Sequence, residues 1–287
     1  MNFEHGSSDC FLKARAHQWH FPRTTLIMGI INITPDSFSG DGLSGHDNGL
    51  LTKVHYFIKQ GADMIDVGAV STRPGAQVVS EEKELERLIP ALKSIHENFN
   101  IPISVDTTNA HVACEALEAG ADFINDISGL RFDPEMPSVA ARYSAGLILM
   151  HSRGTPVTMQ TMIHYDNVIE DIVSELEWSV RCAENAGVDR ESIVIDPGLG
   201  FAKNAEQNFA ILARLRAFGR FGRPILDGPS RKSFIGSVTN KATEDRVFGT
   251  AAACALAVSN GAHMVRVHDV SAVKDAVRVS EEILKHS

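Results

Sequence analysis

Four basic or potentially basic side chains follow short apolar runs of the sequence. They are Arg73, Lys232, Arg266 and His268, and they lie far apart along a chain whose formal net charge is −9. Basic groups gathered against an acidic background would bind an anion, most simply a phosphate or diphosphate. Hydroxyl donors lie beside them in the sequence and could bind the same anion, namely Ser71, Thr72, Ser230 and Ser233.

A second set of side chains accepts hydrogen bonds. Asp106, Asn125 and Asp196 each follow a short apolar run. A carboxylate can accept two parallel N–H bonds from the edge of a 2-amino-pyrimidinone, and each charge-assisted bond is worth about 1.5–3 kcal/mol. These residues therefore predict a pocket for a flat nitrogen heterocycle. The sequence has no HExxH, Walker A or GxGxxG pattern, which argues against metalloprotease, P-loop and Rossmann functions.

Each of these residues has a simpler explanation when it is taken alone. An isolated Asp or Asn after a strand is often the N-cap of the following helix. Helix caps do not require four basic groups to converge on the same face. The complete set therefore favours a functional site.

Eight short apolar runs, each followed by a polar or glycine-rich patch, must position these residues. The runs are Leu26–Ile31, Met64–Val67, Ile103–Val105, Phe123–Asn125, Gly146–Met150, Ser192–Ile195, Pro224–Leu226 and Met264–Val267. Most lack polar alternation, as expected for a parallel sheet that is covered on both faces. We predict an α/β fold, a single (β/α)8 TIM barrel over residues 25–287, with an open doubly wound sheet as the alternative. Residues 1–24 are predicted to be an N-terminal extension or barrel plug.

The segments between these runs have helical patterns. Ser80 precedes an acidic first turn and a stripe of apolar residues at helical spacing, from Leu85 to Ile95. Asn167–Ala186 repeats the pattern and stops at Gly187. In a TIM barrel the active site lies at the carboxyl ends of the strands, so the polar patches should meet there.

Composition excludes several classes of protein. Hydrophobic residues make up 44% and charged residues 22%, which are globular values. The acidic balance argues against a nucleic-acid partner. Four scattered cysteines without a CxxC pair argue against a zinc site and a disulfide scaffold. No run is long enough to cross a membrane, and the N-terminus lacks the apolar core of a secretory signal, so we expect a cytoplasmic protein.

An ordered set of motifs resembles the dihydropteroate synthase family. The motifs are MGIINITPDSFSGDG, DVGAVSTRPGA, SVDT, IND, MH followed by TMQ, IDPGLGFAK, GPSRKSFIG and VRVHDV. The resemblance covers about residues 25–284. It implies a TIM barrel, usually a homodimer, that joins 6-hydroxymethyl-7,8-dihydropterin diphosphate to para-aminobenzoate with magnesium.

The resemblance also implies roles for individual residues. The pterin-pocket positions are Asp106, Asn125, Met150, Asp196, Phe201 and Lys232. The diphosphate side comprises Asn32, Thr72, Arg73, Arg266 and His268, with Asn32 also the protein ligand of Mg²⁺. The para-aminobenzoate pocket comprises Phe38, Thr72, Pro74, Lys232 and Ser233. The residues expected to take part in catalysis are Arg73, Lys232, Arg266 and His268.

The implied mechanism is substitution with early loss of diphosphate. A delocalised cation on the pterin methylene is then attacked by the aryl amine. Mg²⁺ would be held mainly by substrate oxygens and water, because one amide oxygen is a poor site for this ion alone. The first two loops, which include Asp36, would fold over the ligands and exclude water.

The chain departs from the family pattern in places. Ala69 and Val70 replace a glycine and an acidic residue, Asp227 replaces an apolar residue, and Leu199 and Ala202 replace commoner choices. An ordinary enzyme and a sulfonamide-insensitive variant both remain open. The alternative function is a methyltetrahydrofolate corrinoid methyltransferase-like barrel, which does not need the cationic loops. A non-catalytic folate-binding barrel is a third reading, against which the intact ring of polar residues argues.

Overall fold

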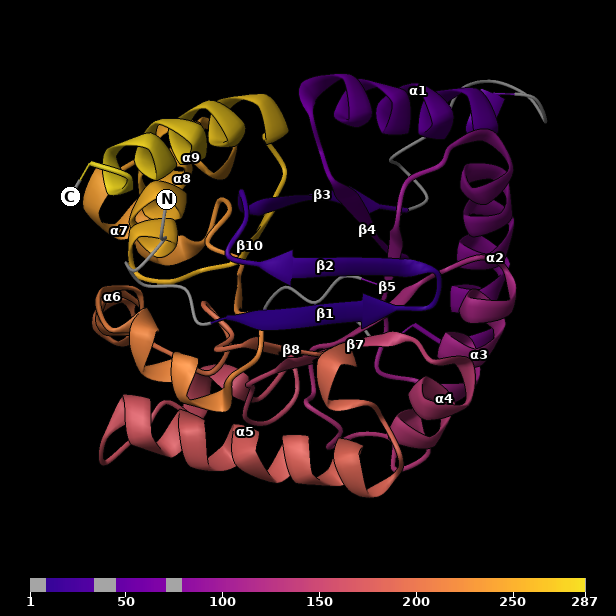
Figure 1. Ribbon diagram of the computed structural model, residues 1–287, viewed down its shortest axis with the longest axis horizontal. Coiled ribbons are helices and arrows are strands. Elements are labelled where there is room, and N and C mark those ends of the chain that lie inside the picture. The colour runs from indigo at the N-terminus through magenta and orange to yellow at the C-terminus, as the bar shows by residue number, and fades with distance from the viewer. Residues whose placement is uncertain (1–8, 34–44, 71–78, 287) are drawn as a thin grey trace.

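Eight parallel strands form the wall of a barrel in the computed structural model, which describes residues 9–33, 45–70 and 79–286 (Figure 1). The strands are β3 (Leu26–Asn32), β4 (Met64–Gly68), β5 (Ile103–Asp106), β6 (Phe123–Asp126), β7 (Gly146–Met150), β8 (Ile193–Asp196), β9 (Leu226–Asp227) and β10 (Met264–Val267). They pair in the order β8-β7-β6-β5-β4-β3-β10-β9. A parallel bridge between Ile195 and Ile225 connects the two ends of this sheet.

The strand order confirms the predicted TIM barrel. Strands that follow one another in the chain lie side by side, and β10 returns to pair with β3. A doubly wound sheet would instead reverse its strand order at a switch point. The alternative fold is therefore wrong. Each of the eight predicted runs overlaps one of the observed strands, although Pro224–Leu226 shares only Leu226 with β9.

Helices surround the barrel (Figure 1). They are α1 (Gly45–Gln60), α2 (Glu81–Asn98), α3 (Ala110–Glu118), α4 (Met136–Tyr143), α5 (Val168–Asn185), α6 (Ala205–Ala213), α7 (Ser233–Thr239), α8 (Val247–Ser259) and α9 (Val270–Leu284). Four short 3₁₀ helices also occur in the described part of the chain: η1 (Met159–Thr161), η2 (Arg190–Ser192), η3 (Leu215–Phe221) and η4 (Thr243–Asp245). Within the described ranges, none of the helices is long and apolar enough to cross a bilayer.

The helix signals of the sequence are confirmed. Helix α2 begins after Ser80 and buries Leu88, Leu92 and Ile95 of the predicted stripe. Helix α5 begins after Asn167, whose side chain accepts hydrogen bonds from two backbone N–H groups of the first turn. Gly187 follows α5 with a φ of 94°, a left-handed conformation that favours glycine.

An antiparallel hairpin of β1 (Cys10–Ala14) and β2 (His17–Phe21) lies across the amino end of the barrel (Figure 1). Its inward side chains, among them Leu12 and Phe21, join a buried cluster with the apolar residues that fill the barrel interior. The sequence analysis did not predict these two strands. The hairpin occupies the place of the expected plug and blocks the end of the barrel opposite the polar strand ends.

The barrel interior is apolar toward the amino ends of the strands and polar toward their carboxyl ends. The apolar layer includes Met64, Phe123, Val194 and Met264. Side chains alternate faces along a strand, so the residues two positions further on also point inward. These residues are Asp66, Asn125, Asp196 and Arg266. The apolar layer therefore forms the floor of a polar site.

Candidate active site

Acceptor side chains at the ends of neighbouring strands form one wall of this site. Asp106, Asn125 and Asp196 end or nearly end β5, β6 and β8, and all three are buried. Met150 ends β7 between them and is buried as well. Parallel strands of a barrel place their carboxyl ends at the same mouth. The strand order therefore brings these groups together.

Arg266 of β10 joins the basic and acidic parts of the site. Its Nη2 lies 2.8 Å from Asp106 Oδ2, and its Nε donates to Asp66 Oδ2 at 2.6 Å. Asn125 Nδ2 donates to the same Asp66 oxygen at 3.3 Å. Arg266 thus spans the barrel interior from β10 to β5. The guanidinium lies on the same side of the barrel as the acceptor wall.

Asp66 is a site residue that the sequence analysis missed. It lies inside β4 and is fully buried, and its Oδ1 has no hydrogen-bond partner among the described residues. The available signal was an acid within the apolar run Met64–Val67, two residues after a core methionine. An acid at that spacing in a barrel strand points inward and needs a cation, which is Arg266 here.

Lys232 lies above the ring of Phe201, with 4.1 Å between its Nζ and the ring centroid. This is a cation–π contact. Burial lowers the pKa of Lys232 to about 8, and Arg266 acts in the same direction, while Asp196, Asp106 and Asp227 oppose the shift. Lys232 therefore keeps its proton at neutral pH, where it interacts electrostatically with the carboxylates of Asp106 and Asp196.

The two carboxyl groups at the mouth are shifted in the opposite sense. Burial raises the pKa of Asp196 to about 6, against the Gly198 N–H bond at 2.7 Å and the charge of Lys232. Burial also raises the pKa of Asp106 to about 7, against the charge of Arg266. Both groups therefore release their protons less readily than exposed acids, and Asp106 does so only near neutral pH.

His268 follows β10 and is neutral at pH 7. Burial lowers its pKa to about 3, and the charges of Arg266 and Arg231 act in the same direction. Its Nδ1 lies 2.9 Å from Ser230 Oγ, and its backbone N–H donates to the same oxygen at 3.1 Å. The sequence analysis counted this residue among the basic groups. Its burial beside two arginines makes it a neutral hydrogen-bonding group instead.

The remaining predicted residues divide into two groups. Asn32 ends β3 and is exposed at the carboxyl end of the barrel, and Ser233 begins α7 and is exposed. The others lie outside the described residues, namely Asp36, Phe38, Ser71, Thr72, Arg73 and Pro74. The placement of the first two loops therefore remains a prediction.

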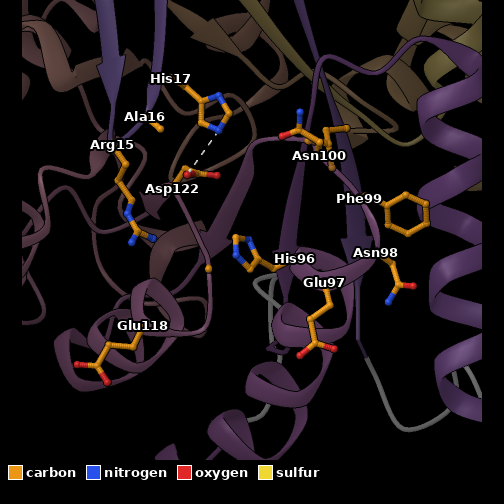
Figure 2. Close-up of a pocket in the computed structure, with 12 residues that line it drawn as sticks. Arg15, Ala16, His17, His96, Glu97, Asn98, Phe99, Asn100, Glu118 and Asp122 are labelled. Atoms are coloured by element: carbon orange, nitrogen blue, oxygen red, sulfur yellow. Dashed lines mark ion pairs between the residues drawn. The ribbon is translucent and has the colours of Figure 1, made fainter.

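A cavity of about 590 Å³ lies at the amino end of the barrel, away from these residues (Figure 2). The hairpin turn and the segments before β5 and β6 line it. Within it, His17 Nε2 lies 3.6 Å from Asp122 Oδ1, and Arg15 donates to the carbonyls of Leu117 and Ala121. None of the predicted site residues contributes to this cavity.

Asp227 of β9 is fully buried, and both of its carboxyl oxygens lack a hydrogen-bond partner among the described residues. Burial raises its pKa well above the ordinary value, and the charge of Asp196 adds to the shift. Burial therefore favours the protonated form of this residue. Among the departures from the family pattern, Asp227 is the one whose buried polar atoms the surrounding described residues leave unpaired.

Comparisons with known proteins show which family and which solved structures the chain resembles. The family described as pterin binding enzyme matches residues 28–268. Dihydropteroate synthase of Synechocystis is 48% identical over 265 residues, which are 91% of each chain. A dihydropteroate synthase structure from Clostridium difficile, determined in the presence of pteroic acid, has a TM-score of 0.86 at 41% identity and covers 91% of this chain and 97% of its own. The Xanthomonas albilineans enzyme with 4-aminobenzoic acid has a TM-score of 0.87 at 37% identity, with 96% and 98% covered.

Proposed function

The chain belongs to the pterin-binding enzyme family, as a dihydropteroate synthase, and from this premise we propose how its own residues carry the reaction. The substrates are 6-hydroxymethyl-7,8-dihydropterin diphosphate and para-aminobenzoate. The bond between the pterin methylene and the diphosphate oxygen breaks, a bond from the methylene to the amine nitrogen forms, and one amine proton leaves. The products are 7,8-dihydropteroate and diphosphate.

The pterin ring binds against the acceptor wall. Asp196 and Asp106 accept N–H bonds from the ring edge, and Asn125 offers one further polar contact. Met150 and Phe201 are buried apolar walls beside the ring, and Lys232 above Phe201 contacts its polar atoms. Each bond to a carboxylate is worth about 1.5–3 kcal/mol, so a ligand that leaves these groups unpaired is rejected.

The diphosphate binds on the β10 side of the mouth. Arg266 supplies a fixed positive charge that its two carboxylate partners orient, and neutral His268 supplies a ring N–H. The resemblance assigns Asn32, Thr72 and Arg73 to the same side. Positive charge placed where negative charge develops favours early departure of the leaving group.

The para-aminobenzoate binds above the pterin methylene. Lys232 and Ser233 lie at the start of α7, and the resemblance assigns both to this pocket. The resemblance adds Phe38, Thr72 and Pro74 from the first two loops. Holding the amine in line and excluding water prevents hydrolysis of the electron-poor methylene.

Magnesium is a proposed cofactor. The chain offers the exposed amide oxygen of Asn32, and the described residues contain no cluster of three His, Cys, Asp or Glu groups that could hold a metal. One amide oxygen fits an ion that keeps water and substrate oxygens as its other ligands, as Mg²⁺ usually does. When bound, the ion would neutralise charge on the diphosphate.

Loss of diphosphate before amine attack is the proposed order of events. The cation left on the methylene spreads into the ring, and the nearby carboxylates of Asp106 and Asp196 stabilise it. The leaving diphosphate remains paired with Arg266 and the other diphosphate contacts. No covalent nucleophile is needed, and none of the four cysteines lies at the carboxyl end of a barrel strand, since Cys10 begins β1 and the others lie in helices.

The observation that carries this proposal is the contact between Arg266 and Asp106, which joins the diphosphate side to the pterin wall. We expect diphosphate release that requires the pterin substrate and Mg²⁺ and that matches dihydropteroate formation when para-aminobenzoate is present. A coupled diphosphate assay measures it. Methyl transfer from methyltetrahydrofolate, with no diphosphate release, would contradict the proposal.

Asp196→Ala should abolish pterin binding, because the ring's N–H donors would be buried without partners. A loss of about 100-fold or more in affinity is expected from two such bonds. Calorimetric titration with 6-hydroxymethylpterin measures it, with exposed Asp245→Ala on η4 as the control. Equal affinities of the two variants would remove Asp196 from the pterin site.

A homodimer is proposed from the apolar surface of α7, α8 and α9, which lie together on one side of the barrel (Figure 1). Exposed side chains there include Val238, Phe248, Leu256, Val279 and Ile283. Exposed apolar patches of this kind mark protein interfaces. Phe248→Glu should shift sedimentation toward the monomer, and Tyr56→Glu on α1 should not. A monomeric wild-type protein at micromolar concentration would contradict the dimer.

The response of the enzyme to sulfonamides is a further proposal. Ala69, which is buried, and Val70 lie at the start of the second loop, where the family carries a glycine and an acid. We propose that these changes weaken inhibition by sulfonamides, and Ala69→Gly with Val70→Glu should restore it in the diphosphate assay. Inhibition of the wild type as strong as that of the double variant would refute this.

A cytoplasmic location is proposed, to be tested by cell fractionation.

A further inference from the structure

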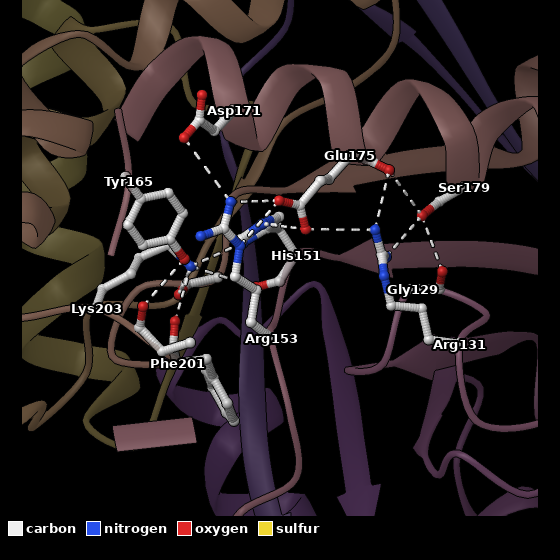
Figure 3. A network of polar contacts seen from close by, with 12 residues as sticks. Gly129, Arg131, His151, Arg153, Tyr165, Asp171, Glu175, Ser179, Phe201 and Lys203 are labelled. Atoms are coloured by element: carbon white, nitrogen blue, oxygen red, sulfur yellow. Dashed lines mark hydrogen bonds and ion pairs between the residues drawn. The ribbon is translucent and has the colours of Figure 1, made fainter. Parts of the chain in front are cut away.

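A buried lysine, Lys203, holds the turn that follows β8. Its Nζ donates to the carbonyl oxygens of Phe201 at 2.8 Å and Gly198 at 3.0 Å, and it lies 3.0 Å from His151 Nδ1 (Figure 3). The residue is 4% exposed. An ammonium group has three donors and no acceptor, so its protons are all directed at this turn and at the end of β7.

The turn adopts a backbone that needs such support. Gly198, Gly200 and Ala202 all have left-handed φ angles, of 72°, 80° and 49°. For a residue with a Cβ, such as Ala202, this conformation is sterically unfavourable. Strained backbone persists where surrounding contacts fix it. The bonds from Lys203, together with the Tyr165 hydroxyl that donates to Ala202 O at 3.0 Å, are contacts of this kind.

The same turn carries two groups of the pterin pocket. Asp196 begins it, and its Oδ1 accepts the Gly198 N–H at 2.7 Å. Phe201 near its end lies beneath Lys232. A shift of the turn would therefore move the pterin-reading carboxylate and the apolar wall together.

His151 connects Lys203 to a second support. Burial lowers the pKa of Lys203 to about 7. In its ammonium form Lys203 can only donate, so His151 Nδ1 then accepts and the ring proton lies on Nε2. This atom is 3.3 Å from Glu175 Oε2 of α5, an ion-pair distance without hydrogen-bond alignment. Glu175 also binds Arg153 Nε at 2.9 Å and lies 3.5 Å from Arg131 (Figure 3). The segments that follow β6, β7 and β8 thus meet on one chain of polar contacts.

We propose that Lys203 is a positioning residue for the pterin pocket, which it serves by fixing the turn from Asp196 to Phe201 against His151. This inference rests on the proposed pterin reaction and assigns a role in it to a residue that does not touch the substrate. The role predicts an effect on pterin affinity rather than on the chemical step.

Lys203→Met tests the inference. We expect the Kd for 6-hydroxymethylpterin and the KM for its diphosphate to rise about tenfold or more, and kcat and the KM for para-aminobenzoate to change less than about threefold. Lys93→Met, on the exposed face of α2, is the control. A merely structural role would lower the active fraction, and hence kcat, at unchanged Kd. A folded Lys203→Met protein whose Kd is within about twofold of the wild type would overturn the proposal.

If Lys203→Met does not fold, two variants of His151 test the positioning role instead. The Asn side chain places its oxygen near the position of His Nδ1, so His151→Asn keeps the acceptor for Lys203, whereas His151→Leu removes it. We expect near-normal pterin affinity in the first and about tenfold weaker binding in the second. Equal affinities would overturn the proposal. Absence of pterin binding by the wild type would instead refute the proposed function itself.

Discussion

At the scale of single residues, the site gathers charges that are costly to bury. Asp106 and Asp196 have raised pKa values, Lys232 has a lowered one, and Arg266 is fixed between two carboxylates. A ligand that carries N–H donors and negative charge matches all of these groups at once. Perturbed ionisable groups of this kind are common at catalytic sites.

The pH dependence of kcat/KM for the pterin substrate follows from these groups. As the pH falls through about 7 and then about 6, Asp106 and Asp196 take up protons and can no longer accept N–H bonds as carboxylates. Above about pH 8, Lys232 loses its proton. We expect a bell-shaped profile with limbs near these values. Lys232→Arg should move the alkaline limb upward, and an unmoved alkaline limb in this variant would contradict the assignment.

Asp227→Val should stabilise the protein by about 1–3 kcal/mol at neutral pH, because it removes a buried carboxyl group without partners. The sign of the pH dependence follows from the raised pKa. Above about pH 4 the unfolded chain releases this proton while the folded protein keeps it, so the wild type loses stability as pH rises.

The gain from Asp227→Val should therefore be larger at pH 8 than at pH 5. Urea unfolding at both values measures it, with Asp245→Val on η4 as the exposed control. A gain that is equal at the two pH values would mean that Asp227 is ionised in the folded state.

At the scale of elements, the sequence predicted every barrel strand and the polar residue that follows it. Apolar runs and helix periodicity are local signals that can be found in the sequence. Because all strands of a parallel barrel end at the same face, the residues that follow them are then expected to lie together. Asp66 and Lys203 were missed because their partners, Arg266 and His151, are distant in the chain. The sequence does not predict the hairpin β1–β2, because its strands are short and lie outside the repeated strand–helix pattern.

Gly198→Ala should destabilise the protein by about 2 kcal/mol or more. The residue has a φ of 72°, and a Cβ there would lie 2.0 Å from the backbone oxygen of His151, which cannot move aside easily. Gly219→Ala in η3 is the matched control, because a Cβ at that position would meet nothing within 4 Å. Thermal unfolding of the two variants measures the difference. Similar melting temperatures would show that the turn can relax.

At the scale of the whole molecule, the apolar hairpin and the proposed substrate site lie at opposite ends of one barrel. The hairpin closes the amino end with apolar side chains, and the acceptor wall and Arg266 occupy the carboxyl end. The cavity beside Arg15 and Asp122 belongs to the amino end (Figure 2). Changes in the plug should therefore affect folding without changing substrate recognition.

Leu12→Ala should lower the free energy of unfolding by about 2–5 kcal/mol, because Leu12 is fully buried in the plug. The KM for the pterin substrate should stay within about twofold of the wild type. Lys13→Ala, on the outward face of the same strand, should change the free energy of unfolding far less, because its ion pair with Glu191 is partly exposed. Urea unfolding and steady-state kinetics measure both effects. A large rise in KM for Leu12→Ala would show that the two ends are coupled.

A crystal structure of the protein with the pterin diphosphate substrate tests the central claim most directly. We expect the ring between Asp106 and Asp196, beside Phe201, with the diphosphate against Arg266 and His268. Density for the substrate at the amino end, in the cavity beside Arg15, or a diphosphate directed away from Arg266, would contradict it.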